Sequence, residues 1–194
     1  MSLPYVLLLH GLNGSGPAHW QNWLAGELAH HGAQVDMPVF GDPDRPTLDV
    51  WLAELRTHLM AAPSTGERVV VAHSLGCLLW LHHADTFDDP ALRVDRVLLV
   101  APPRPDHVEP LVTTFMPPPQ DPAALRRAAV TTRLVAGEGD PNLTLAEAKL
   151  LAETLRVDLD VIVGGGHLNA DSDYGSWPAV LKWVRSDRTP LTPR

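Results

Sequence analysis

Short apolar segments rich in Val and Leu alternate along this sequence with longer segments of helical periodicity. Nearly continuous apolar runs are typical of parallel strands covered on both faces, and parallel strands need a crossover connection that is usually a helix. The alternation therefore predicts an α/β fold with a doubly wound, mostly parallel sheet of about six strands and flanking helices. The expected strands are Tyr5–Leu9, Gln34–Pro38, Arg68–Ala72, Arg96–Ala101, Arg133–Ala136 and Asp160–Val163.

Apolar stripes and capping residues mark the helices between these strands. One stripe runs over 20–28 and is followed by Gly32, a residue favoured just after a helix C-terminus. Another runs over 48–59 and follows Thr47, a favourable N-cap residue. Two further helices are expected to begin at the capping box Thr144-Leu145-Ala146-Glu147 and at Ser176-Trp177-Pro178.

A proline-rich stretch over 102–122 interrupts this alternation, ahead of a helix-like segment at Pro122–Ala129. It contains eight prolines and little periodicity. Long irregular connections in compact domains are usually functional or disordered, and the apolar residues between 111 and 116 favour a lid or pocket wall here. Residues 1–194 are expected to form a single domain, with a frayed tail at 187–194.

The charge balance argues against several classes of partner. The net charge is -8 and Lys149 and Lys182 are the only lysines, whereas nucleic-acid binding needs clustered Lys and Arg. Cys77 is the only cysteine, so no internal disulfide is expected. The N-terminus lacks signal-peptide features, and no apolar run reaches the roughly 18 residues of a membrane-spanning helix. We therefore expect a cytoplasmic protein with no nucleic-acid partner and no membrane span.

The strongest functional signal lies between Val69 and Trp80. A buried strand is followed by Ala72-His73-Ser74-Leu75-Gly76 and then by an apolar, helix-like run. This arrangement is typical of a nucleophile elbow, a sharp strand-to-helix turn that exposes the serine hydroxyl and needs small residues two positions before and after it. The Leu75 backbone N–H, at the helix start, is then positioned to bind an oxyanion. The alternative is that Ser74 merely caps an ordinary helix.

A second loop, Leu9-His10-Gly11-Leu12-Asn13-Gly14-Ser15-Gly16, follows the first expected strand. In enzymes with a nucleophile elbow, the corresponding loop supplies the second oxyanion N–H, which by position belongs to Leu12. Gly11 allows a close approach of the backbone to substrate, and His10 is expected to brace the loop rather than act as a base. The competing interpretation is a phosphate loop, but the Gly-Lys-Ser/Thr ending and the acidic ribose partner are missing.

An acid and a histidine must follow the serine in that order. Among ten histidines, His167 stands out because it follows an expected strand and a Gly164-Gly165-Gly166 turn that can bring its imidazole over Ser74. The acid candidates follow another strand. Asp140 is preferred to Glu138 because it lies further from the strand end and precedes a proline, and its carboxylate can orient the histidine and stabilise the imidazolium.

Together these segments resemble the small serine hydrolases related to the retinoblastoma-binding serine hydrolase and the bacterial YdeN-like proteins. The shared parts are the Leu-His-Gly loop with its nearby tryptophans, Ala-His-Ser-Leu-Gly-Cys at 72–77, Glu-x-Asp-Pro at 138–141, and Gly-His-Leu-Asn at 166–169 ahead of Gly-Ser-Trp-Pro at 175–178. The resemblance implies a minimal α/β-hydrolase fold with little or no cap. It also implies a triad of Ser74, Asp140 and His167, since the family aspartate immediately precedes a proline.

Two departures from this family limit what the resemblance implies. Animal members carry a Leu-x-Cys-x-Glu motif that binds a retinoblastoma-type pocket. Here Leu75-Gly76-Cys77 is followed by two leucines, so the glutamate is missing and no such partner is implied. The proline-rich stretch is also longer than the family pattern, so the shape of the pocket is not carried over.

The expected reaction is acyl transfer to water from a small ester, thioester or amide. His167 deprotonates Ser74, Asp140 orients His167, and the N–H groups of Leu12 and Leu75 bind the oxyanion. Two residues support the site: Gly76 keeps the elbow compact, and Asn169 braces the histidine loop. No metal-ligand spacing such as His-Glu-x-x-His occurs, so neither a metal nor a cofactor is expected.

Two other functions remain open from the sequence. The same triad serves lyases, such as hydroxynitrile lyases, that form no acyl-enzyme, and a vestigial site can belong to a binding protein. An aspartate-nucleophile dehalogenase is excluded because Ser74 occupies the nucleophile position.

Overall fold

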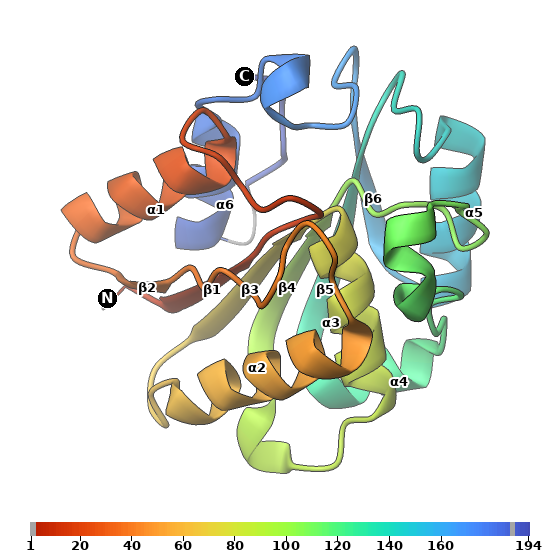
Figure 1. Ribbon diagram of the computed structural model, residues 1–194. Coiled ribbons are helices and arrows are strands. Elements are labelled where there is room, and N and C mark those ends of the chain that lie inside the picture. The colour runs from red at the N-terminus through yellow and green to blue at the C-terminus, as the bar shows by residue number, and fades with distance from the viewer. Residues whose placement is uncertain (1–2, 187–188) are drawn as a thin grey trace.

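The computed structural model describes residues 3–186 and 189–194 as one sheet between two layers of helices (Figure 1). The strands are β1 (Tyr5–Leu9), β2 (Gln34–Asp36), β3 (Arg68–His73), β4 (Val94–Val100), β5 (Ala129–Gly137) and β6 (Asp158–Ile162). The α-helices are α1 (Trp20–His30), α2 (Leu48–Ala61), α3 (Leu75–Asp85), α4 (Pro122–Ala128), α5 (Leu145–Leu155) and α6 (Pro178–Arg185). Three short 3-10 helices are η1 (Pro90–Leu92), η2 (Pro110–Phe115) and η3 (Ala170–Ser172).

The sheet has the order β2-β1-β3-β4-β5-β6, and all its neighbouring strands are parallel. The prediction of a doubly wound parallel sheet of about six strands is confirmed. From β1 the chain passes to β2, which neighbours β1 on one side in the sheet. It then crosses to β3, which neighbours β1 on the other side. Since crossovers of parallel strands are right-handed, this reversal places α1 on the opposite face from α2, α3, α4 and α5.

Each face of the sheet has its own apolar layer. Leu7 and Val70 belong to the apolar layer of α2, α3, α4 and α5, whereas Val6 and Val69 belong to that of α1 and α6. Figure 1 shows α1 and α6 together, apart from α2 and α3. Because both faces are covered, the central strands need apolar side chains at successive positions, which explains their continuous Val and Leu runs.

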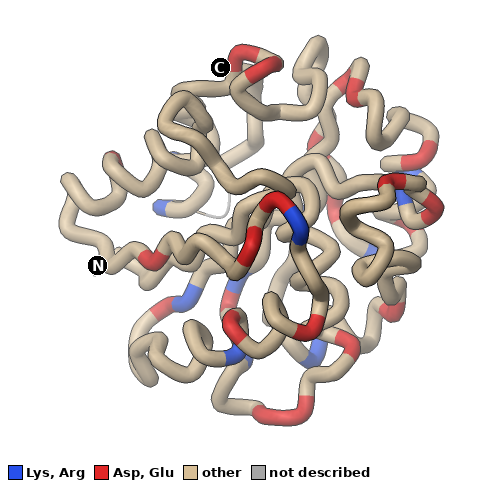
Figure 2. The backbone as a smooth tube through the Cα atoms, viewed as in Figure 1, with Lys and Arg blue, Asp and Glu red and all other residues tan. Residues whose placement is uncertain are grey.

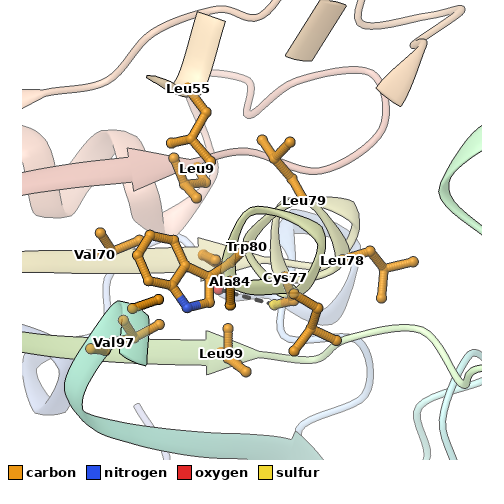
Figure 3. Close-up of a cluster of buried hydrophobic side chains, with 14 of the residues drawn as sticks. Leu9, Leu55, Val70, Cys77, Leu78, Leu79, Trp80, Ala84, Val97 and Leu99 are labelled. Atoms are coloured by element: carbon orange, nitrogen blue, oxygen red, sulfur yellow. Dashed lines mark hydrogen bonds between the residues drawn. The ribbon is translucent and has the colours of Figure 1, made fainter. Parts of the chain in front are cut away.

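Helix α3 is the most deeply buried helix in the described chain, because α2, α4 and η2 surround it. Its Cys77, Trp80 and Ala84 point toward Val97 and other apolar residues of the sheet (Figure 3). The Cys77 thiol also donates to the Val100 carbonyl, 3.3 Å away. The helix that follows Ser74 is therefore held rigidly against the sheet.

Most element boundaries agree with those expected from the sequence, and the differences occur at strand ends. Strands β4, β5 and β6 begin earlier than expected, because polar residues such as Asp95 and Thr131 continue the ladder where the strands approach solvent. Strand β2 ends at Asp36 because it pairs only with β1 over three residues. The Thr144 capping box forms as predicted, whereas Thr47 occupies the N-cap of α2 without a side-chain hydrogen bond.

The proline-rich stretch contains η2, whose Val112 and Phe115 are buried. The Phe115 ring packs edge-on against Trp51 of α2, with 5.4 Å between ring centroids. The Phe115 carbonyl accepts a hydrogen bond from Nε2 of His82 in α3 at 2.9 Å. The stretch is therefore anchored on the helical layer and carries regular structure that its proline content concealed.

The end of the chain differs from expectation. Leu191 is 5% exposed, and the Thr192 carbonyl accepts a hydrogen bond from Nε1 of Trp177 at 2.7 Å. The expected frayed tail over 187–194 is therefore wrong for residues 189–194, because an apolar side chain anchors them. The other two residues of that prediction, 187–188, lie outside the described residues. Within the described ranges, no helix is both long and apolar enough to cross a membrane.

Candidate active site

The loops that follow β1, β3, β5 and β6 meet at the carboxyl edge of the sheet. The strand order reverses between β1 and β3, and crevices at such switch points are the usual ligand sites of open α/β sheets. A cavity of about 430 Å³ lies at this edge, and Ser74, His167 and both predicted oxyanion donors line it.

Ser74 occupies a sharp turn between β3 and α3. Its φ of 52° and ψ of -118° lie in a region that non-glycine residues rarely adopt, and such strain is typical of functional positions. The Ser74 backbone N–H donates to the Val100 carbonyl at 2.9 Å, which fixes the turn. A Cβ atom on Gly76 would lie 2.6 Å from the Leu9 carbonyl oxygen, so only glycine fits this position of the elbow.

His167 and Asp140 reach Ser74 from two other loops. Nε2 of His167 lies 3.0 Å from the Ser74 hydroxyl oxygen, and Nδ1 lies 2.9 and 3.0 Å from the two Asp140 carboxylate oxygens. The Asp140 side chain is 1% exposed and the His167 side chain 13%. An Nδ1–H that donates to the carboxylate leaves Nε2 free to accept the serine proton, which is the tautomer that nucleophile activation needs.

Glu138, the alternative acid, points elsewhere. Its carboxylate accepts a hydrogen bond from the Gly164 N–H at 3.2 Å, and its carbonyl accepts one from the Gly166 N–H at 2.9 Å. Glu138 therefore ties the β5 loop to the loop that carries His167. The structure places the Asp140 carboxylate, and not that of Glu138, against the histidine.

Asn169 acts on the histidine loop through backbone contacts. Its side-chain oxygen accepts from the Ser172 N–H at 3.0 Å, and its carbonyl accepts from the Tyr174 N–H at 2.9 Å. The Ser172 hydroxyl in turn accepts from the His167 N–H at 3.1 Å. Asn169 thus fixes the short helix η3, which holds the backbone of His167.

The loop after β1 places Leu12 beside the elbow. A Cβ on Gly11 would lie 3.0 Å from Cβ of Ser74, so the two loops are in close contact. Nε2 of His10 accepts from the Phe40 N–H at 2.9 Å, and its Nδ1 donates to the Gly11 carbonyl at 2.7 Å. Burial lowers the pKa of His10, in keeping with a bracing role for a neutral imidazole.

Hydrogen bonds to the Leu12 and Leu75 backbone N–H groups are absent among the residues that the structure describes. Both residues line the cavity, and the Leu75 N–H lies at the N-terminus of α3. The first N–H groups of a helix have no partner within the helix and lie at its positive end. These two groups are therefore available to an oxygen atom bound beside Ser74.

Sequence reasoning missed two residues beside the catalytic candidates. His73 is buried, and its Nε2 donates to the His167 carbonyl at 3.0 Å. Burial lowers its pKa well below the usual value, with smaller effects from His19 and His167. The Asn142 N–H donates to Oδ1 of Asp140 at 2.8 Å, and its side-chain amide lies 3.3 Å from Nδ1 of His167. The available signal was position in the sequence, since His73 directly precedes Ser74 and Asn142 lies two positions after Asp140.

Several residues of the proline-rich stretch line the cavity, among them Pro103, His107, Glu109 and Val112. The stretch therefore supplies part of the cavity wall, and its movement as a lid stays a prediction. Lys and Arg are absent from the described residues that line the cavity, and Figure 2 shows them dispersed over the chain. Within the described residues, no group of three His, Cys, Asp or Glu side chains is arranged to hold a metal ion.

A parallel sheet with a serine at the turn from β3 to α3 defines the fold as that of an α/β-hydrolase. The sequence model of the family described as Serine hydrolase matches residues 6–186, and the chain belongs to this family. A comparison with curated proteins gave no match.

Solved structures of the same fold include small hydrolases of YdeN type. The ydeN product of Bacillus subtilis is 24% identical with a TM-score of 0.80, and the alignment covers 94% of this chain and 97% of that one. A putative YdeN-like hydrolase from Pectobacterium atrosepticum is 22% identical with a TM-score of 0.76, covering 94% and 90%. The thioesterase domain of the curacin biosynthetic pathway is 18% identical with a TM-score of 0.69, covering 95% and 92%.

Proposed function

We propose that the protein is an esterase-type serine hydrolase that uses Ser74, His167 and Asp140 as a catalytic triad. The observation that carries this proposal is the chain of contacts from the Ser74 hydroxyl to Nε2 of His167, 3.0 Å, and from Nδ1 of His167 to the buried Asp140 carboxylate, 2.9 Å. A serine hydroxyl is a weak nucleophile until an oriented base accepts its proton, and these contacts provide that base.

The proposed reaction has two steps. In the first, Ser74 attacks the carbonyl of an ester, thioester or amide while His167 takes the serine proton, and the N–H groups of Leu12 and Leu75 bind the oxyanion. His167 then protonates the leaving group, and an acyl-enzyme remains. In the second, His167 removes a proton from water, which attacks the acyl-enzyme and frees Ser74. Asp140 stabilises the imidazolium in both steps.

This mechanism needs neither a metal nor a cofactor. The wall of the cavity combines histidine and asparagine side chains with apolar ones such as Leu12, Val112 and Pro103, which suits a small acyl substrate. No nucleic-acid or retinoblastoma-type partner is part of the proposal, and the cytoplasmic location stays a prediction.

Covalent labelling with a fluorophosphonate probe tests the nucleophile. We expect the wild-type protein to be labelled, Ser74→Ala to lose labelling completely, and Ser64→Ala, a change at an exposed serine, to label like wild type. Absence of labelling in the wild type, or equal labelling of wild type and Ser74→Ala, would refute the proposal. Loss of labelling in Ser64→Ala would point to a general effect on folding.

Turnover of short p-nitrophenyl esters separates a hydrolase from a lyase and from a binding protein. We expect hydrolysis by the wild type, with kcat lower by roughly 10³-fold or more in Ser74→Ala and in His167→Ala, because triad members act as a unit. Probe labelling without ester turnover would instead favour a lyase. A folded protein with neither property would be a binding protein with a vestigial site.

A further inference from the structure

One residue that lines the cavity carries a buried polar atom that the proposed mechanism does not use. His19, the N-cap residue of α1, lines the cavity together with Ser74 and is 5% exposed. Its Nε2 exposes less than 1 Å² and has no hydrogen-bond partner among the described residues. A buried donor or acceptor without a partner is destabilising, so an unpaired atom on a residue that lines a cavity points to a ligand group that pairs with it.

The contacts of His19 decide which of its nitrogens carries the proton. The Gln21 N–H donates to Nδ1 at 3.2 Å, so Nδ1 is an acceptor and the neutral ring carries its proton on Nε2. Burial and, to a smaller extent, the neighbouring His167 lower the pKa of His19 to about 4. At neutral pH the unpaired atom is therefore a hydrogen-bond donor on an uncharged ring.

The position of His19 indicates which part of a substrate it contacts. Its ring packs against that of His73 with 4.7 Å between centroids, and the His73 ring packs against that of His167 at 5.1 Å. His73 thus separates His19 from His167, beside which the leaving group is protonated. Residues 16–18, which precede His19 in the loop that also carries Leu12, line the cavity as well. A substrate whose leaving group lies beside His167 would then place its acyl group nearer to His19.

The charges around the cavity favour an uncharged acyl group. Burial keeps His19 and His73 neutral, and Glu109 contributes a carboxylate to the wall. Since no Lys or Arg stands among the described lining residues, a carboxylate or phosphate on the acyl chain would lose its hydration without gaining a cationic partner.

We propose that His19 is a specificity residue whose Nε2–H donates a hydrogen bond to an oxygen atom of an uncharged acyl group. The enzyme then prefers acyl chains that carry an ether, keto or hydroxyl oxygen over hydrocarbon chains of the same length. This inference rests on the proposed serine hydrolase function.

Two pairs of esters that differ by one oxygen test the preference. The first pair is p-nitrophenyl methoxyacetate and butanoate, and the second is p-nitrophenyl 3-methoxypropanoate and pentanoate. In each pair an oxygen replaces a methylene group at constant chain length. The measured quantity is the ratio of kcat/KM within a pair, compared between wild type and variants, so that differences in the intrinsic reactivity of the esters cancel.

Two variants separate the cap acceptor of His19 from its donor. Asn at position 19 retains an acceptor where Nδ1 lies, whereas Gln has an amide N–H that can reach the place of Nε2. We expect His19→Asn to lower the oxygen preference by roughly 3- to 10-fold in at least one pair, the effect of one hydrogen bond. We expect His19→Gln to keep the preference within about twofold of the wild type.

The outcomes separate the two proposals. If His19→Asn is labelled by fluorophosphonate and its preference in both pairs matches the wild type, the role of His19 is wrong and the hydrolase proposal stands. If the wild type is not labelled, the hydrolase proposal itself fails. Should His19→Asn not fold, NMR of the wild-type imidazole protons decides the point. A methoxy-bearing phosphonate adduct should shift the His19 Nε2–H downfield relative to its hydrocarbon counterpart, and equal shifts would overturn the inference.

Discussion

At the scale of single residues, the two acids of the β5 loop have separate tasks. Asp140 is buried against His167, whereas Glu138 accepts hydrogen bonds from the backbone of the histidine loop. They lie only two positions apart along the chain. The difference arises because β5 ends at Gly137, after which the chain turns so that the Asp140 carboxylate faces His167.

We expect Asp140→Asn to lower kcat by roughly 10²- to 10⁴-fold, because an amide cannot stabilise the imidazolium and favours the wrong tautomer. Glu138→Gln keeps an acceptor for the Gly164 N–H, and we expect its kcat to stay within about threefold of the wild type. Steady-state hydrolysis of a p-nitrophenyl ester measures both. A larger loss in Glu138→Gln than in Asp140→Asn would reverse the assignment.

At the scale of elements, the nucleophile elbow depends on how closely α3 approaches the end of β1. The start of α3 lies against the Leu9 and His10 carbonyls, with no room for a side chain on Gly76. The buried face of α3 then packs on the sheet around Cys77 and Trp80 (Figure 3). Movement of this helix away from β1 would therefore also move Ser74.

We expect Gly76→Ala to reduce the free energy of unfolding by about 2–3 kcal/mol and to lower esterase activity, because the new methyl group collides with two backbone carbonyls. Gly26→Ala is the matched control, since Gly26 lies exposed in α1 and a Cβ there meets nothing within 4 Å. This change should stabilise the protein by about 0.5–1 kcal/mol through the helix propensity of alanine. Urea unfolding of both variants provides the comparison, and a Gly76→Ala variant as stable as the wild type would contradict the close approach.

At the scale of the whole molecule, folding buries four histidines whose pKa values are lowered. Burial is the largest cause for His10, His19, His73 and His83, and the pKa values of His19 and His83 fall to about 4. The unfolded chain therefore binds protons between about pH 6.5 and 4 that the folded protein does not bind. The part of the unfolding free energy that these neutral histidines contribute is fully present above about pH 6.5. It decreases as the pH falls toward 4.

His83 allows this loss to be tested away from the cavity. Its contribution is up to about 3 kcal/mol between pH 6.5 and 4. We expect His83→Leu to reduce the dependence of unfolding free energy on pH over this range, because leucine does not titrate and Nε2 of His83 has no hydrogen-bond partner among the described residues. His31→Leu, at an exposed position, is the control and should retain the wild-type dependence. Urea titrations at several pH values measure the slope, and equal slopes for His83→Leu and wild type would contradict the prediction.

Local patterns were sufficient to predict the architecture. Continuous Val and Leu runs, helix caps and Gly32 each depend on interactions within a few residues, so the strands, helices and parallel sheet could be inferred without a structure. The nucleophile elbow could be predicted for the same reason, because its strand, turn and helix are contiguous around Ser74. The required order of serine, acid and histidine along the chain then limited the candidates, and Asp140 and His167 were preferred.

Contacts between elements distant in sequence could not be inferred from local patterns. The stacking of His19, His73 and His167 depends on how α1, β3 and the loop after β6 meet at one sheet edge, and no local spacing encodes it. The anchoring of Leu191 likewise depends on a surface formed elsewhere in the chain. The elements and the sharp turn at Ser74 could be inferred from the sequence, because both are local. The fold decided the partners of its buried polar atoms, because burial and hydrogen bonding are properties of the packed chain.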